Sequence, residues 1–167
     1  MATTATNVGD HPCPYGAGQH PYLSPGEGLV DDCTVTLEAA TRIATDPERQ
    51  LPVGRESVDG TAFDFRGGRR LGDLHVDFAF TDLTRDSDGR AWVRLHCPDG
   101  STAETWVDGH YPIVELYTAD TLEASRRRRG LGTEPMTCPP NAFQTGESVI
   151  HLAPGEAITT MWGARLS

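Results

Sequence analysis

The chain has 167 residues, of which 37% are hydrophobic and 23% charged, so it is long enough for one domain with a real core. Its formal net charge is −10, and all 14 basic residues are arginine, which argues against a nucleic-acid partner. No apolar run reaches the length of a membrane span, and no signal-peptide pattern opens the chain. We therefore expect a cytoplasmic protein with no membrane partner.

The four cysteines are scattered along the chain, at Cys13, Cys33, Cys97 and Cys138. No CxxC pair occurs, so neither a zinc knuckle nor a redox motif is indicated. In a cytoplasmic chain of this length we expect four free thiols. The sequence predicts no metal and no cofactor.

In chain order, the first expected elements are a strand over 3–8, a loop over 11–23 rich in Pro and Gly, and a strand over 32–38. In the last of these, Cys33, Val35 and Leu37 alternate with polar residues and should share a buried face. Two prolines, Pro47 and Pro52, interrupt 43–53, so this segment is expected to be a loop with one short extended piece.

A strand follows over 74–83, and the clearest hairpin of the chain joins 91–97 to 102–108 through a Pro-Asp-Gly turn. The remaining expected strands are 113–118, 148–152 and 157–166. Eight or nine short strands, frequent turn signals and no convincing amphipathic helix predict an all-β fold. We expect a single, mainly antiparallel β-sandwich domain over 1–167.

The segment 130–143 has no helical or strand period, and its three prolines argue against a place in a helix or a sheet centre. Glu134 directly precedes Pro135, which favours an extended backbone. Three flanking residues are expected to be buried: Met136, Cys138 and Phe143. A carboxylate in a stiff apolar loop suits a general base, but an ordinary glutamate in a structural loop fits equally well.

Other candidate functional residues leave similar alternatives open. His20, in the loop over 11–23, is either a general acid or a loop histidine bonded to backbone. Asp77 lies within an apolar strand, where it needs an ion-pair partner or a ligand. Aromatic side chains beside carboxylates suit sugars, and Tyr22, Tyr117 and Trp162 are candidates. The residues alone thus favour a sugar-binding sandwich, with or without acid/base catalysis.

Four segments, taken together, resemble motifs of the aldose 1-epimerase (galactose mutarotase) family, in the family's order. The segment 18–23 is similar to the histidine motif, and 74–83 to a strand with an Asp-x-x-Phe pattern. The segment 114–120 is similar to a strand ending in a Tyr-Thr pair. The segment 130–143 resembles the loop that carries the catalytic glutamate.

This resemblance implies a galactose-mutarotase-like β-supersandwich that interconverts the α and β anomers of a free hexose such as glucose or galactose. Carried over by motif, Glu134 would be the general base that takes the proton of the C1 hydroxyl. His20 would be the general acid that protonates the ring oxygen. The residues expected to bind substrate are Asp77, Glu115, Tyr22 and Tyr117. No cofactor or metal is implied.

The chain departs from the family pattern in two ways. Glu115 stands where the family typically has Gln, so it can accept but not donate a hydrogen bond when ionised. The resemblance covers only the family's C-terminal portion, and nothing here matches the Asn-Arg pair and the second histidine of the upstream half. The alternative is therefore a degenerate carbohydrate-binding β-sandwich without turnover.

Two structural expectations follow from the resemblance. If the mechanism holds, Glu134 and His20 should face one cleft, with the width of a pyranose ring between them. A partial sandwich should also leave strand edges exposed, which invite pairing into a homodimer.

Overall fold

The computed structural model describes all 167 residues and is built from antiparallel strands. Two six-stranded sheets form a sandwich, and a two-stranded ribbon stands beside them. The all-β, antiparallel fold expected from the sequence is confirmed. The longest helix, α1 (Ala142–Thr145), has four residues, and no helix of the chain could span a membrane.

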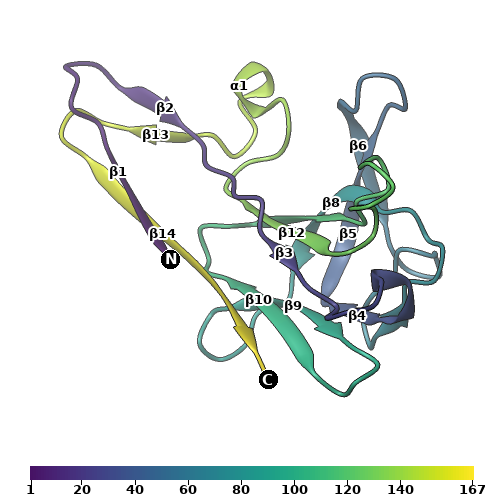
Figure 1. Ribbon diagram of the computed structural model, residues 1–167. Coiled ribbons are helices and arrows are strands. Elements are labelled where there is room, and N and C mark those ends of the chain that lie inside the picture. The colour runs from purple at the N-terminus through teal and green to yellow at the C-terminus, as the bar shows by residue number, and fades with distance from the viewer.

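The first sheet contains, in spatial order, β1 (Ala2–Thr6), β14 (Ala157–Leu166), β10 (Thr102–Val107), β9 (Ala91–His96), β4 (Thr34–Leu37) and β7 (Arg69–Arg70). The second contains β3 (Tyr22–Leu23), β12 (Leu131–Met136), β11 (Ile113–Tyr117), β8 (Asp77–Leu83), β5 (Ala39–Thr45) and β6 (Pro52–Ser57). The ribbon pairs β13 (Ile150–Leu152) with β2 (Cys13–Tyr15). Together with β1 and one end of β14, this ribbon forms an arm that reaches beyond the sandwich (Figure 1).

The core lies between the two sheets because apolar residues alternate with polar ones along the strands. On β4, Cys33, Val35 and Leu37 are buried as the sequence predicts, with Cys33 just before the strand. From the second sheet, Phe80 and Leu116 belong to the same cluster. Each such side chain contributes about 1.5–3 kcal/mol on burial. The outer face of the second sheet carries polar side chains beside a smaller apolar cluster of Ile43, Ala79 and Ile113.

The segment 43–53, expected to be a loop with one short extended piece, instead contributes to two paired strands. β5 and β6 run antiparallel, with Ile43 opposite Arg55. Their turn is held by the Asp46 carboxylate, which accepts backbone N–H groups of Glu48, Arg49 and Leu51. The expectation was wrong because the two prolines fall outside the ladder's interior. Pro52 opens β6, an edge strand, where a missing N–H costs little.

The segment 130–143 was also misjudged, since its first part is strand β12, between β3 and β11. Strand parity explains how a proline fits there. The amides of Thr133 and Thr137 donate to the backbone of 17–21. Pro135 has the same parity, so its missing N–H faces this irregular segment and not the ladder with β11. Its carbonyl still accepts from the Gln19 amide at 3.1 Å.

All four cysteines are free thiols, as expected.

Candidate active site

Three carboxylates lie side by side on the outer face of the second sheet. Glu134 on β12 is directly opposite Glu115 on β11, and Tyr117 on β11 is opposite Asp77 on β8. Residues of one parity face the core on each strand, so these four face away from it. Strand register therefore assembles groups that are up to 57 residues apart in sequence.

His20 lies against this face, in the segment between β2 and β3. Its Nε2 is 3.0 Å from Oε1 of Glu134. The backbone on each side of His20 is bonded to β12: the Gln19 amide donates to Pro135, and the Pro21 carbonyl accepts from Thr133. The imidazole is thus held beside the glutamate by a fixed backbone.

The side chain of Gln19 gives His20 a further tether. The Gln19 Oε1 atom accepts a hydrogen bond from the indole Nε1 of Trp162 at 3.0 Å. Trp162 belongs to β14 of the first sheet, so this bond ties the histidine segment to that sheet. The sequence motif includes Gln19 but does not reveal this role, because its partner is 143 residues away.

Two tyrosines form an aromatic wall beside the imidazole. The rings of His20 and Tyr22 are stacked, with centroids 4.9 Å apart. Tyr117 meets His20 edge-on at 6.1 Å. Gly132 makes room here, because a Cβ at that position would lie 3.1 Å from the Tyr117 Cβ and 3.3 Å from Oε1 of Glu134. Such a wall suits the apolar face of a sugar ring.

These groups line one hollow of about 350 Å³, which is within the range of small-molecule sites. The six residues that the family resemblance implies line it, together with Thr121 and Leu122. Trp162, the third candidate aromatic, does not line it. The two extra residues had no sequence signal, since they follow the Tyr-Thr motif in a turn. Thr121 is hydrogen-bonded to the Tyr117 hydroxyl.

The clustered acids perturb one another. Burial, followed by repulsion from Glu115 and Asp77, raises the pKa of Glu134 to about 8. Burial, followed by repulsion from Asp77 and a hydrogen bond to it, raises the pKa of Glu115 to about 7. The His20 imidazole, when protonated, favours the ionised form of Glu134 at 3.0 Å and so opposes its rise in pKa. A carboxyl that titrates near neutrality can exchange protons with a substrate.

The distance between base and acid differs from the expectation. The two groups do face one hollow, but they touch at 3.0 Å and are not separated by the width of a pyranose ring. The His20 side chain is 52% exposed, against 15% for Glu134. The histidine is therefore the partner that has room to move when a ligand enters.

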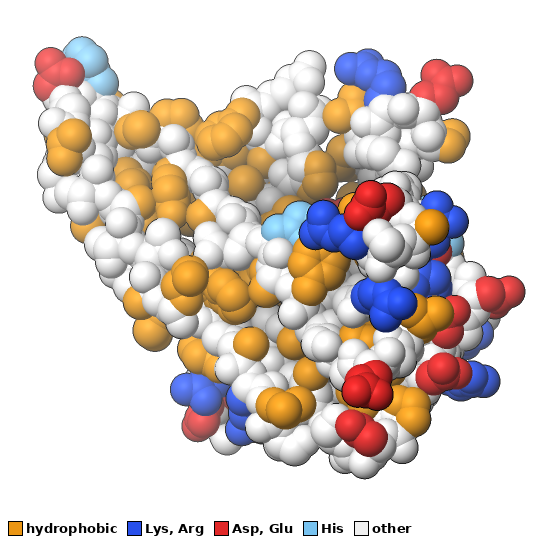
Figure 2. All heavy atoms as spheres, viewed as in Figure 1, with side chains coloured by type: hydrophobic (Ala, Val, Ile, Leu, Met, Phe, Trp, Pro, Cys, Tyr) orange, Lys and Arg blue, Asp and Glu red, His pale blue; other side chains and the backbone are white.

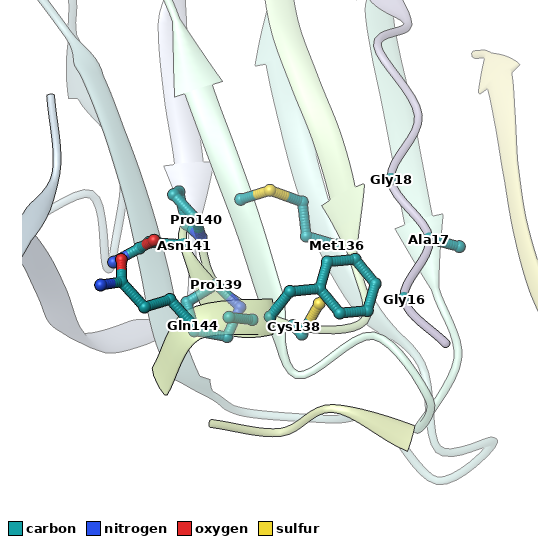
Figure 3. Close-up of a pocket in the computed structure, with 11 residues that line it drawn as sticks. Gly16, Ala17, Gly18, Met136, Cys138, Pro139, Pro140, Asn141 and Gln144 are labelled. Atoms are coloured by element: carbon teal, nitrogen blue, oxygen red, sulfur yellow. The ribbon is translucent and has the colours of Figure 1, made fainter. Parts of the chain in front are cut away.

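A second cavity, of about 290 Å³, opens beside α1 at the far end of β12 (Figure 3). Phe143 lies at its rim and is 68% exposed, so its expected burial was wrong, whereas Met136 and Cys138 are half-buried. The lining carries no carboxylate or imidazole, and the acid/base chemistry belongs to the first hollow. No group of three or more His, Cys, Asp and Glu has an arrangement suited to a metal ion.

Comparison with known proteins identifies the family. The family model described as aldose 1-epimerase matches residues 1–161. The uncharacterized protein YihR of Escherichia coli K12 is 30% identical over 156 residues, which are 90% of this chain and 46% of YihR.

Solved structures share the fold. A galactose mutarotase-like protein of Clostridium acetobutylicum is 15% identical, with a TM-score of 0.79 over 99% of this chain and 51% of that one. Galactose 1-epimerase of Lactobacillus acidophilus is 23% identical, with a TM-score of 0.73 over 96% and 51%. The chain thus spans about half the length of these relatives. By its sequence match and its fold, the chain belongs to the aldose 1-epimerase family.

Proposed function

We propose that this chain interconverts the α and β anomers of a free hexose by general acid/base ring opening. Glu134 takes the proton of the C1 hydroxyl, and His20 gives a proton to the ring oxygen. The ring opens, the C1–C2 bond rotates, and the ring closes on the other face with the two roles reversed. The observation that carries the proposal is the Glu134–His20 pair, held at 3.0 Å in a hollow with an aromatic wall.

The short distance is compatible with this chemistry. The C1 hydroxyl oxygen and the ring oxygen are both bonded to C1, so the base and the acid address neighbouring atoms. Each needs a hydrogen bond of about 2.6–3.2 Å to its own oxygen. The imidazole therefore has to move away from Glu134 only far enough to admit this pair of oxygens.

The pair also holds the proton that the reaction needs. With one proton between them, it exists as Glu134 carboxylate with imidazolium or as carboxylic acid with neutral imidazole. Only the first form has a base for the C1 hydroxyl and an acid for the ring oxygen. Because the proton returns to the pair when the ring closes, each turnover regenerates the starting state.

The remaining lining residues would hold the sugar. Asp77 and Glu115 accept hydrogen bonds from ring hydroxyls. Glu115 can also donate when protonated, which partly replaces the amide that the family typically has there. Tyr22 and Tyr117 pack against the ring face.

The test is an assay of α-glucose and α-galactose mutarotation by polarimetry or a coupled dehydrogenase. Glu134→Gln and His20→Asn are each expected to lower kcat/KM by at least about 100-fold. Glu27→Gln and His11→Asn, at exposed positions outside the hollow, serve as matched controls. Wild-type activity unaffected by Glu134→Gln would refute the assignment.

Sugar binding without turnover is the second candidate, favoured by the exposed Tyr22 ring at the rim. A soluble chain that shows sugar-dependent quenching of tryptophan fluorescence but no mutarotation would support it.

A further inference from the structure

Another hollow, distinct from the cavity beside α1, adjoins the candidate active site and shares two of its lining residues, Tyr22 and Leu122. Its volume is about 380 Å³. The other residues that line it are Ala119, Arg126, Arg129 and Gly130. No acidic residue lines it, in contrast to the three carboxylates of the first hollow. Figure 2 shows this face, with basic side chains beside a histidine near its centre.

Neither arginine of this hollow is in an ion pair. Seven other arginines of the chain make nine salt-bridge contacts, but none involves Arg126 or Arg129. The Arg129 guanidinium donates only to the backbone carbonyl of Ser125. Two guanidinium groups that bound one cavity without a carboxylate partner can accommodate an anion.

The loop that carries these arginines is anchored. Arg128, between them, is buried, and its guanidinium binds the carboxylates of Asp31 and Asp120 at 2.6 and 2.8 Å. Its backbone adopts a left-handed conformation, with φ of 56°. This inward turn of Arg128 leaves its neighbours Arg126 and Arg129 exposed, on the side that faces Tyr22.

We propose that this hollow binds an anionic group on C6 of the hexose, so that the substrate class is an aldose with a phosphate ester or a carboxylate at C6. The inference rests on the proposed function for the orientation of the sugar. If His20 protonates the ring oxygen, C5 and its C6 substituent lie on the His20 side. Tyr22 is stacked on His20 and is also a wall of the arginine hollow.

The charges of the surroundings are compatible with an anion there. Burial raises the pKa of the Tyr22 phenol, Tyr117 and Glu134 raise it further, and Arg126 opposes them, so the basic and acidic groups act on the same ring. The net charge of −10 acts mainly at long range and is screened beyond about 8 Å at physiological ionic strength. Direct guanidinium contacts are screened much less.

The test is isothermal titration calorimetry of the whole chain with glucose, glucose 6-phosphate, glucuronate and inorganic phosphate. Glucose 6-phosphate or glucuronate should bind about 10- to 100-fold more tightly than glucose. The Arg126→Ala/Arg129→Ala variant should remove this advantage and leave glucose binding within about twofold. Arg69→Ala/Arg127→Ala changes the net charge equally at exposed arginines outside the hollow and should retain it.

The outcomes separate this inference from the proposed function. Tighter binding of an anionic sugar that depends on Arg126 and Arg129 supports the inference, whether or not the sugar is turned over. The ratio of the Kd values for glucose 6-phosphate and glucuronate identifies the preferred anion. If neutral and anionic sugars bind equally tightly, or if no anionic sugar binds, the inference is overturned, even if glucose is turned over. Inorganic phosphate that binds as tightly as glucose 6-phosphate also overturns it, because the sugar would then contribute nothing.

Discussion

Glu115 is the residue whose charge most affects its neighbours in the candidate site. It lies opposite Glu134 across the β11–β12 ladder, and its own pKa is raised by burial and by the nearby Asp77. Like charges at such positions disfavour ionisation, so the acids hold protons at neutral pH that isolated carboxyls would lose. The state of Glu115 therefore sets the pH at which Glu134 becomes a base.

The pH dependence of activity should reveal this coupling. Because the proposed active state shares one proton between Glu134 and His20, kcat/KM should follow a bell-shaped dependence on pH, and its alkaline limb should lie near the Glu134 pKa of about 8. In Glu115→Gln one source of repulsion is gone, so the pKa of Glu134 falls and this limb should move to lower pH. A pH–rate profile of mutarotation measures the shift. An unchanged profile would show that Glu115 does not control the base.

Stability should depend on pH through the same residue. The pKa of Glu115 is raised from 4.5 to about 7 in the folded chain, so the folded state binds more protons than the unfolded state between these values. The contribution of protonated Glu115 to the stability of the folded chain is fully present below about pH 4.5 and is lost as pH rises through 7. Glu115→Gln should therefore be more stable than wild type at about pH 8, by on the order of 1 kcal/mol.

Urea unfolding at several pH values measures this difference. Glu27→Gln, at an exposed position, is the control. A Glu115→Gln variant with the same pH slope as wild type would contradict the prediction.

At the scale of elements, the loop over 119–130 depends on one buried arginine. Arg128 ties it to Asp31 after β3, to Asp120 in the loop itself and to two backbone carbonyls. Removing one partner of a buried ion pair typically costs about 3–5 kcal/mol. The low end of this range applies here, because the Asp31 and Asp120 side chains are 34% and 27% exposed. Arg128→Ala should thus lower the free energy of unfolding by about 3 kcal/mol.

Thermal and urea unfolding measure the effect of Arg128→Ala. The matched control is Arg127→Ala, next to it and exposed, which should change stability by less than about 0.5 kcal/mol. Equal losses in the two variants would mean that the ion-pair network does not hold the loop.

Local pattern was enough to predict some of these elements and not others. The β9–β10 hairpin and strand β4 follow from alternation that a turn and a buried face reinforce. β12 was missed because Pro135 argues against a sheet interior. Only the structure of the neighbouring segment 17–21 shows that the ladder needs no N–H donor at this position. The six site residues were predicted from motif order. Their distances were not, because they depend on the register of three strands and on the bond between Gln19 and Trp162.

At the scale of the molecule, the two sheets expose four edges of unequal character. β3 and β7 have two residues each, which is too short to pair with another chain. β6 carries Pro52, Arg55 and Glu56, which discourage pairing. β1, with the sequence ATTAT, has five residues and carries no charged side chain and no proline. It is the edge where a homodimer can form.

The pairing of β1 indicates how to test this. The backbone of Met1 bonds to Trp162 of β14, and that of Asn7 bonds to Gly155 and Glu156 just before this strand. Odd-numbered residues therefore face β14, and the amides of Ala2, Thr4 and Thr6 face outward. Two copies joined along this edge would be related by a two-fold axis. We therefore expect a dimer in solution, and Thr4→Pro should convert it to a monomer because it removes the central outward donor.

Sedimentation velocity over a concentration series measures the association. Thr4→Ala keeps the amide but loses the same hydroxyl bond to Thr159, so it should remain dimeric. A wild-type chain that stays monomeric at all concentrations would refute the prediction. A dimer that survives Thr4→Pro would place the interface on another part of the molecule, such as the face of the arm or the rim around Phe143.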